Sequence, residues 1–161
     1  MADVIIIDTG AGISDSVLEF VASSAEVLLV TTPEPTSITD SYALLKALNT
    51  RNGYEKDNTV IKMIANRVSD YEDGKNLYNK LNVVVNKFLN VNLEFLGIIP
   101  LDNNIAKSVI QQTPISIAYP NSVGTKAFID LTDILLDKKI DEVPKKGLAQ
   151  VFLKMFRSKK N

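Results

Sequence analysis

The 161-residue sequence contains no cysteine and no histidine. Without cysteine there is no disulfide framework, no thiol nucleophile and no thiolate zinc site. Without histidine, Ser-His-Asp and Cys-His catalysis and histidine-ligated transition metals are excluded as well. Chemistry in this chain must depend on carboxylates, hydroxyls, amides, basic side chains and backbone dipoles, a set that suits Mg²⁺ and phosphate.

Long apolar runs are also missing, because no stretch reaches the roughly 18 residues that a membrane-spanning helix needs. No basic residue precedes the apolar segment near the N-terminus, so no signal peptide is predicted. Hydrophobic residues make up 45% of the chain and charged residues 23%, which is typical of a globular domain. We therefore expect a cytoplasmic protein.

Charge is distributed unevenly, although the net charge of the whole chain is only −1. Residues 145–161 contain six basic side chains and no acidic one, which leaves 12 basic and 19 acidic side chains in the rest. The acidic body is a poor candidate for nucleic-acid binding, and no nucleic-acid partner is predicted. The basic end suggests an anionic partner of its own.

Strand-like apolar segments alternate with helical patterns along the chain. Short turns between them predict βαβ units, and hence an α/β fold whose mostly parallel sheet is flanked by helices. The predicted strands span residues 3–8, 26–30, 59–65 and 93–99. The predicted helices span residues 14–23 (capped by Ser14), 37–48 (capped by Ser37 or Thr36), 73–89, 103–112, a segment opened by Asn121 or Ser122 that ends near residue 136, and 148–159.

The carboxylate of Asp8 follows the first predicted strand, and Gly10 and Gly12 follow it closely. Ligands of open parallel sheets bind beside the carboxyl ends of the strands. An acid at that position suits a magnesium ion, and the glycines would let backbone N–H groups approach a phosphate. An acid that merely begins a turn and caps the next helix is the structural alternative. A phospho-acceptor of the receiver type is disfavoured, because no earlier strand with an acidic pair is present.

Five segments carry recognisable motifs, and in chain order they read DVIIIDTGAGIS (3–14), VTTPEPTSITDSYALLK (30–46), MIANRV (63–68), LGIIPLDNNIAKSV (96–109) and TPISIAYPNS (113–122). Together they resemble the MinD/ParA family of deviant-Walker ATPases. The segment 3–14 resembles the Walker B and switch II region, and 30–46 resembles the strand, loop and helix after it. The later segments resemble the adenine-contacting strand, the Pro-x-Asp segment near the base and the stretch that follows. The sequences of the first two segments are most similar to the flagellar-number regulators of that family.

The resemblance implies a partial P-loop NTPase fold, with ATP and Mg²⁺ as cofactors. It implies that Asp8 is the Walker B acid that acts on the metal, and that Gly12 is the switch II glycine. Asn66 would hydrogen-bond adenine and Arg67 would flank the base. Pro100 and Asp102 would border the adenine pocket. Each of these residues also has a structural alternative: Asn66, Arg67 and Pro100 at the ends of strands, and Asp102 as a helix cap.

The phosphate-binding loop of that family has no counterpart in the sequence. A search for G-x-x-x-x-G-K-[ST] finds only Gly74-Lys75, which lies on a predicted helix and is followed by Asn76. The chain is therefore expected to be the C-terminal portion of a family member. Phosphoryl transfer depends on that loop, its lysine and Mg²⁺, so weak or absent nucleotide binding and no ATP hydrolysis are expected. Unpaired sheet edges would favour a homodimer or a strand-swapped oligomer.

The last segment is predicted to be a basic amphipathic helix that binds an anionic membrane surface. Five apolar side chains share one face and basic side chains occupy the other. The predicted divisions are 1–137 for the nucleotide-binding part, 138–147 for a linker and 148–161 for the membrane-targeting helix. The family carries a comparable helix. The residues involved are Leu148, Val151, Phe152, Met155 and Phe156 on the apolar face, with Lys154 and Arg157 opposite.

Two functions follow from these observations. The first is a nucleotide-switch protein at the inner face of the cell membrane that regulates flagellar number or placement, or division-site selection. Flagellar or division regulatory proteins would be its partners. The second is a non-catalytic module that binds a partner or a membrane and no longer binds nucleotide.

Overall fold

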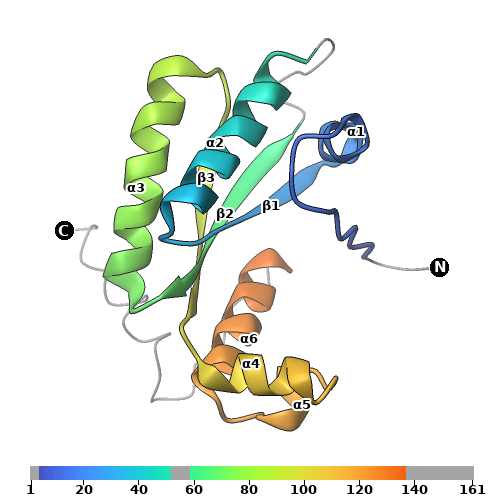
Figure 1. The fold of residues 1–161 in the computed structure, drawn as a ribbon, viewed down its shortest axis with the longest axis vertical. Helices are drawn as coiled ribbons and strands as arrows, with labels where there is room; N and C mark the ends of the chain where they lie inside the picture. The colour runs from blue at the N-terminus through green and yellow to red at the C-terminus, as the bar shows by residue number, and fades with distance from the viewer. Residues whose placement is uncertain (1–3, 52–58, 137–161) are drawn as a thin grey trace.

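A computed structural model describes residues 4–51 and 59–136 of the chain (Figure 1). Helices and strands alternate as the sequence predicts. The predicted linker 138–147 and helix 148–159 lie outside the described residues. The elements are α1 (Asp15–Ser23), β1 (Glu26–Thr31), α2 (Pro35–Asn49), β2 (Val60–Val68), α3 (Tyr71–Phe88), β3 (Leu93–Pro100), α4 (Asn103–Ile110), α5 (Ile115–Ala118) and α6 (Val123–Leu135).

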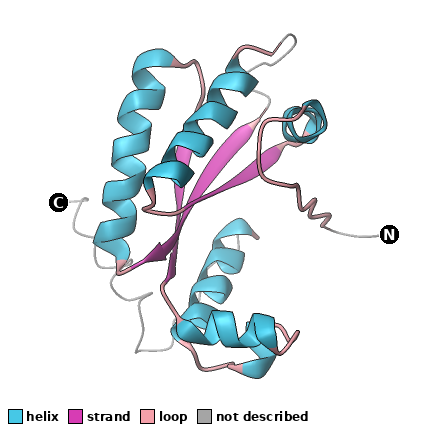
Figure 2. Ribbon diagram, viewed as in Figure 1, coloured by secondary structure: helices cyan, strands magenta, loops and turns pink. Residues whose placement is uncertain are grey.

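The three strands form a parallel sheet in the order β1-β2-β3, with β2 in the centre (Figure 2). Parallel pairing of strands separated by helices requires crossover connections, and α2 and α3 supply them. The predicted class, an α/β fold with a mostly parallel sheet flanked by helices, is therefore confirmed.

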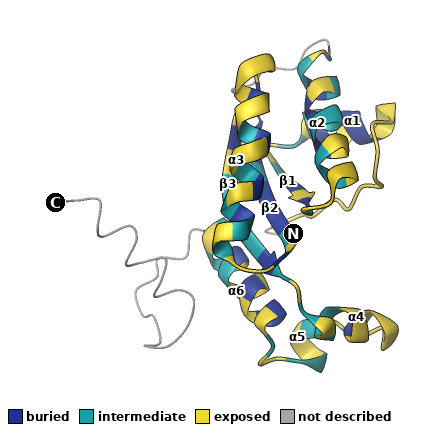
Figure 3. Ribbon diagram, turned by 60° about the vertical axis from the view of Figure 1, so that its left-hand side comes forward, coloured by how far each residue is buried: buried dark blue, intermediate teal, exposed yellow. Residues whose placement is uncertain are grey.

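Two apolar clusters cover the opposite faces of this sheet. The larger one joins Met63 of β2 to apolar side chains of α1, α2 and α3. The smaller one joins the next residue, Ile64, to Leu96 and Ile99 of β3 and to Leu131 of α6. Because successive side chains of a strand point to opposite faces, α6 lies on the face opposite α2 and α3. Figure 3 shows the burial concentrated between the sheet and these helices.

Helix starts follow the capping side chains. The Ser14 hydroxyl accepts a hydrogen bond from the Val17 N–H, so the predicted cap of α1 is confirmed. The Ser122 hydroxyl accepts one from the Thr125 N–H, so α6 is capped by Ser122, one of the two residues predicted to open it, and not by Asn121. α3 begins at Tyr71, two residues before the predicted start, because Asp70 accepts a hydrogen bond from the Asp73 N–H.

The predicted start of α2 at Ser37 is wrong. The helix begins at Pro35, whose fixed φ suits the first helical position, and no side chain caps it. The Ser37 hydroxyl instead accepts a hydrogen bond from the Thr32 N–H at 3.0 Å. That bond ties the first turn of α2 to the end of β1.

The strand predicted over residues 3–8 is also wrong where the structure describes it. Residues 4–10 are irregular and exposed, with Ile5 and Ile6 79% and 83% exposed. A strand needs a neighbour for its backbone N–H and C=O groups, and no described strand pairs with this segment. Apolar β-branched composition alone therefore did not make it part of the sheet.

Candidate functional site

Because the strands are parallel, their carboxyl ends lie at one edge of the sheet, where ligands of open α/β sheets bind. Thr31 of β1 stands opposite Ala65 of β2, and Val68 of β2 stands opposite Pro100 of β3. The predicted base-contacting residues Asn66, Arg67 and Pro100 are thus brought together at this edge, which we call the carboxyl edge.

Arg67 adopts an unusual backbone conformation at the carboxyl edge. Its φ is 58°, in the left-handed region that costs a side-chain-bearing residue energy. The pairing of β2 with β3 is irregular between Asn66 and Val68, which places Arg67 at a bulge. Arg67 is exposed, whereas Asn66 is half-buried. The bulge therefore turns the guanidinium outward while Asn66 stays closer to the sheet.

The exposed end of Arg67 contacts the loop after β1. Its Nη1 atom lies 3.4 Å from Oε1 of Glu34, the residue just before α2. The two side chains are 60% and 59% exposed, so this ion pair contributes little to stability. It does link the β1–α2 loop to the end of β2.

A hydrogen bond between two hydroxyl groups also holds the end of β1 against α2. Thr31 and Ser41 share a buried hydrogen bond of 2.7 Å. The next side chain is different, because the Thr32 Oγ1 atom is buried without a hydrogen-bond partner. Buried polar atoms are nearly always partnered, so the Thr32 hydroxyl is an exception at the carboxyl edge.

Asp102 has a structural role beside this edge. Its Oδ1 atom accepts a hydrogen bond from the Asn104 N–H at 2.8 Å, and Oδ2 accepts one from the Gly124 N–H at 3.0 Å. Asp102 therefore caps α4 and ties it to the first turn of α6. The bond from Gly124, followed by that from Asn104, holds the pKa of the carboxyl below its usual range.

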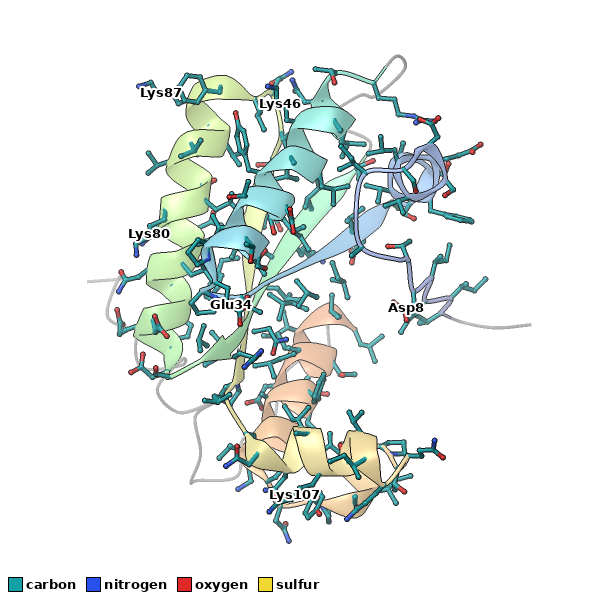
Figure 4. The ribbon with its side chains drawn as sticks, viewed as in Figure 1. Asp8, Glu34, Lys46, Lys80, Lys87 and Lys107 are labelled. Carbon is teal, nitrogen blue, oxygen red and sulfur yellow. The ribbon has the colours of Figure 1, made fainter. Side chains whose placement is uncertain are left out.

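Asp8 and Gly12 are not brought to the contacts around Arg67. Asp8 is exposed on the irregular N-terminal segment, well apart from Glu34 in Figure 4. Gly12 has a φ of 112°, a conformation that favours glycine, and lines a small pocket of about 290 Å³ with Asp40 and Ala43 of α2. Their predicted roles in metal binding and switching remain predictions.

Magnesium is usually held by one or two carboxylates together with phosphate and water oxygens. Among residues 4–51 and 59–136, no group of three acidic side chains is close enough to hold a metal ion by itself. The predicted adenine-binding roles of Asn66 and Arg67 also remain predictions.

Sequence reasoning missed Glu34, Thr32 and Ser37 as parts of the site. Glu34 could have been found from the sequence, because proline favours the first helical position. Pro35 would then have placed Glu34 at the N-cap of α2. The unpartnered Thr32 hydroxyl and the left-handed Arg67 depend on how the loop and bulge pack. Neither follows from residue type.

The parallel sheet and the helices that flank it define an open α/β protein. The ParA family model, described as NUBPL iron-transfer P-loop NTPase, matches residues 1–136. The chain belongs to this family, and the resemblance to MinD/ParA proteins is confirmed.

Two curated relatives have related sequences. Antiactivator FleN of Pseudomonas aeruginosa is 44% identical over 126 residues, which cover 78% of this chain and 44% of FleN. The flagellum site-determining protein YlxH of Helicobacter pylori is 31% identical over 159 residues, which cover 96% of this chain and 52% of YlxH. The chain thus spans about half the length of the curated relatives it matches.

A solved structure shares the fold. The MinD cell division protein of Aquifex aeolicus matches with a TM-score of 0.55 and 23% identity, over 84% of this chain and 52% of that one. No helix within residues 4–51 and 59–136 combines the length and apolar character needed to cross a membrane.

Proposed function

We propose that this chain is the base-recognition and membrane-binding part of a nucleotide-switch protein that regulates flagellar number or placement. Two observations support this proposal. The chain belongs to a P-loop NTPase family, and the ends of β2 and β3 place Asn66, Arg67 and Pro100 together at the carboxyl edge. The flagellar role is supported by the 31% identity to a flagellum site-determining protein. Division-site selection is the alternative cellular role, and regulatory proteins of either process are the proposed partners.

In this proposal the carboxyl edge binds the adenine of ATP. The Asn66 side chain both donates and accepts hydrogen bonds, which matches the donor and acceptor on the adenine edge. The planar guanidinium of Arg67 stacks on the base, and the Pro100 ring gives an apolar wall. Asp102 acts as a positioning residue, because its hydrogen bonds are already used to hold α4 against α6.

Calorimetric titration of the chain with ATP and Mg²⁺ tests nucleotide binding. We expect weak binding, which Asn66→Ala weakens about five-fold, the effect of losing about 1 kcal/mol of hydrogen bonding. The matched control is Asn86→Ala on the exposed face of α3, which should bind as the original chain does. Absence of any binding heat would favour the alternative, a partner- or membrane-binding module without nucleotide.

No hydrolytic step is assigned to Asp8, because phosphoryl transfer depends on a phosphate-binding loop and its lysine, and the sequence contains no G-x-x-x-x-G-K-[ST] motif. We therefore expect no measurable ATP hydrolysis by this chain. A phosphate-release assay on the original chain and on Asp8→Ala tests this expectation. Turnover that disappears in the variant would show that Asp8 does manage a catalytic metal.

We further propose that residues 148–161 bind the inner face of the cell membrane. The apolar side chains and surrounding basic residues suit an anionic lipid surface. Phe152→Glu should abolish co-sedimentation with anionic vesicles. Gln150→Glu changes the charge by the same amount on the opposite side of the predicted helix and should retain most binding. Equal losses in both variants would contradict an apolar insertion.

A further inference from the structure

Glu34 presents its carboxylate from a fixed main chain just before α2. The residue lies between Pro33 and Pro35, and a residue that precedes proline is confined to extended conformations. Its φ and ψ are −65° and 133°, and its C=O accepts a hydrogen bond from the Ile38 N–H at 3.1 Å. The main chain at Glu34 is therefore held by two prolines and by the first turn of the helix.

The Glu34 carboxylate is not used to cap this helix. An N-cap side chain commonly accepts a hydrogen bond from an N–H of the first turn, and Glu34 makes no such bond. Its Oε1 atom instead lies 3.4 Å from the Nη1 atom of Arg67, at the end of β2. The carboxylate thus contacts the neighbouring strand and not its own helix.

Arg67 holds its side chain at the carboxyl edge from a conformation that suits glycine better than arginine. Its φ is 58°, where a Cβ atom crowds the main chain. The next residue, Val68, is fully buried, and its C=O accepts a hydrogen bond from the Leu101 N–H at 2.9 Å. The bulge is therefore locked in place. Strained conformations persist where the surrounding structure fixes them, and they are concentrated at functional sites.

The geometry of a guanidinium group lets Arg67 serve two contacts at once. Its N–H groups lie in the plane and donate to a carboxylate, whereas its flat face remains free to stack on a base. An ion pair formed before the ligand arrives also reduces the side-chain freedom that binding must remove. Since the main chain is fixed at both Glu34 and Arg67, only the two side chains need to be ordered.

We propose that Glu34 is a positioning residue for base recognition, because it holds the Arg67 guanidinium at the carboxyl edge next to Asn66. The role of Glu34 rests on the proposed binding of adenine at this edge. Glu34 itself does not touch the base in this proposal. It acts through Arg67.

Calorimetric titration with ATP and Mg²⁺ tests this role. We expect Glu34→Gln to weaken ATP binding about two- to five-fold, the size of effect that exposed ion pairs produce. The urea midpoint of unfolding should not change, because the Arg67 and Glu34 side chains are 60% and 59% exposed. The matched control is Glu26→Gln, which breaks the ion pair of Glu26 with Lys62 at 3.0 Å. Glu26 begins β1, at the other end of the sheet, so this control should bind ATP as the original chain does.

A second background separates positioning from a direct effect of the Glu34 charge on the phosphates. In Arg67→Gln the ion pair is already lost, so adding Glu34→Gln should leave ATP binding unchanged. The difference between the original chain and Glu34→Gln should also shrink in about 0.5 M NaCl, because salt screens exposed charges.

Arg67→Gly tests the bulge on its own. Glycine adopts a φ of 58° without strain, so the urea midpoint should not fall, whereas ATP binding should weaken at least as much as in Glu34→Gln. A lower urea midpoint would mean that the Arg67 side chain serves the fold, and it would overturn the positioning role.

The possible results separate this role from the proposed function. No binding heat from the original chain would overturn nucleotide binding and the role of Glu34 together. Measurable binding that is unchanged or tighter in Glu34→Gln would overturn the role of Glu34 alone. Equal losses in Glu26→Gln, or a loss from Glu34→Gln that persists in the Arg67→Gln background, would do the same.

Discussion

At Gly74 the backbone of α3 approaches the sheet too closely for any side chain. A Cβ atom there would clash with the Ile98 side chain and lie 3.2 Å from the Cβ of Ala65. Gly74 thus lies on the buried face of α3, and the Gly74-Lys75 pair lies within a helix, as the sequence predicted. The glycine is explained by packing.

We expect Gly74→Ala to lower the free energy of unfolding by about 1–3 kcal/mol, because the helix must move away from β2 and β3. Urea denaturation measures this change. Gly10→Ala is the control, since a Cβ at Gly10 meets no atom within 4 Å and the change should stay within about 0.5 kcal/mol. Equal effects of the two substitutions would contradict the packing explanation.

Asp102 makes stability depend on pH. Its pKa is lower in the folded chain than in the unfolded chain, first because of the Gly124 N–H and then the Asn104 N–H. A depressed folded pKa stabilises the fold above the unfolded pKa, near pH 4, and this contribution is lost as the pH falls toward the folded value. The ionised carboxylate therefore holds α4 to α6 at neutral pH.

Asp102→Asn should lower the free energy of unfolding by about 1 kcal/mol at pH 7, because the amide has one acceptor oxygen for two N–H groups. The difference from the original chain should shrink as the pH is lowered below about 4. Denaturation curves between pH 3 and pH 7 measure it. Asp40→Asn, an exposed residue of α2, is the control, and a difference independent of pH would contradict the assignment.

Among the helices and strands, those that carry a capping residue or a continuous apolar run could be predicted from the sequence. Helix α1 follows its Ser14 cap, and the strands β1, β2 and β3 were predicted from continuous apolar runs. The four-residue α5 was missed, because its ISIA sequence lacks a cap and is too short for a helical period. Local pattern thus predicts capped helices and strands between turn signals best.

The segment 3–8 shows the limit of this reasoning. Its apolar, β-branched residues predict a strand, yet strand formation depends on a neighbour that composition does not reveal. The candidate site shows the same limit, because part of its geometry depends on packing that the sequence does not reveal. Asn66, Arg67 and Pro100 were predictable as residues at strand ends, whereas the Glu34 contact and the left-handed Arg67 result from the bulge and from α2 packing.

At the scale of the molecule, the described part of the chain, residues 4–51 and 59–136, has two apolar clusters of unequal size. The larger one contains 14 buried residues, and the smaller one contains four, of which Leu131 is the contribution of α6. At Gly97 a Cβ atom would lie 2.9 Å from the Leu131 Cδ2 atom, so α6 packs closely on β3 at that point. We infer that α6 is held by few buried side chains and opens before the rest.

Leu131→Ala should therefore speed amide hydrogen exchange in α6 while leaving α3 unchanged, because the lost contacts hold one helix and not the central sheet. Leu81→Ala removes the same atoms from α3, where the side chain is 2% exposed in the larger cluster, and should lower global stability by about 2–5 kcal/mol. Exchange in both α3 and α6 should then accelerate. Mass spectrometry of peptides from the two helices separates the outcomes. Equal acceleration of α3 by both substitutions would mean that the two clusters unfold as one unit.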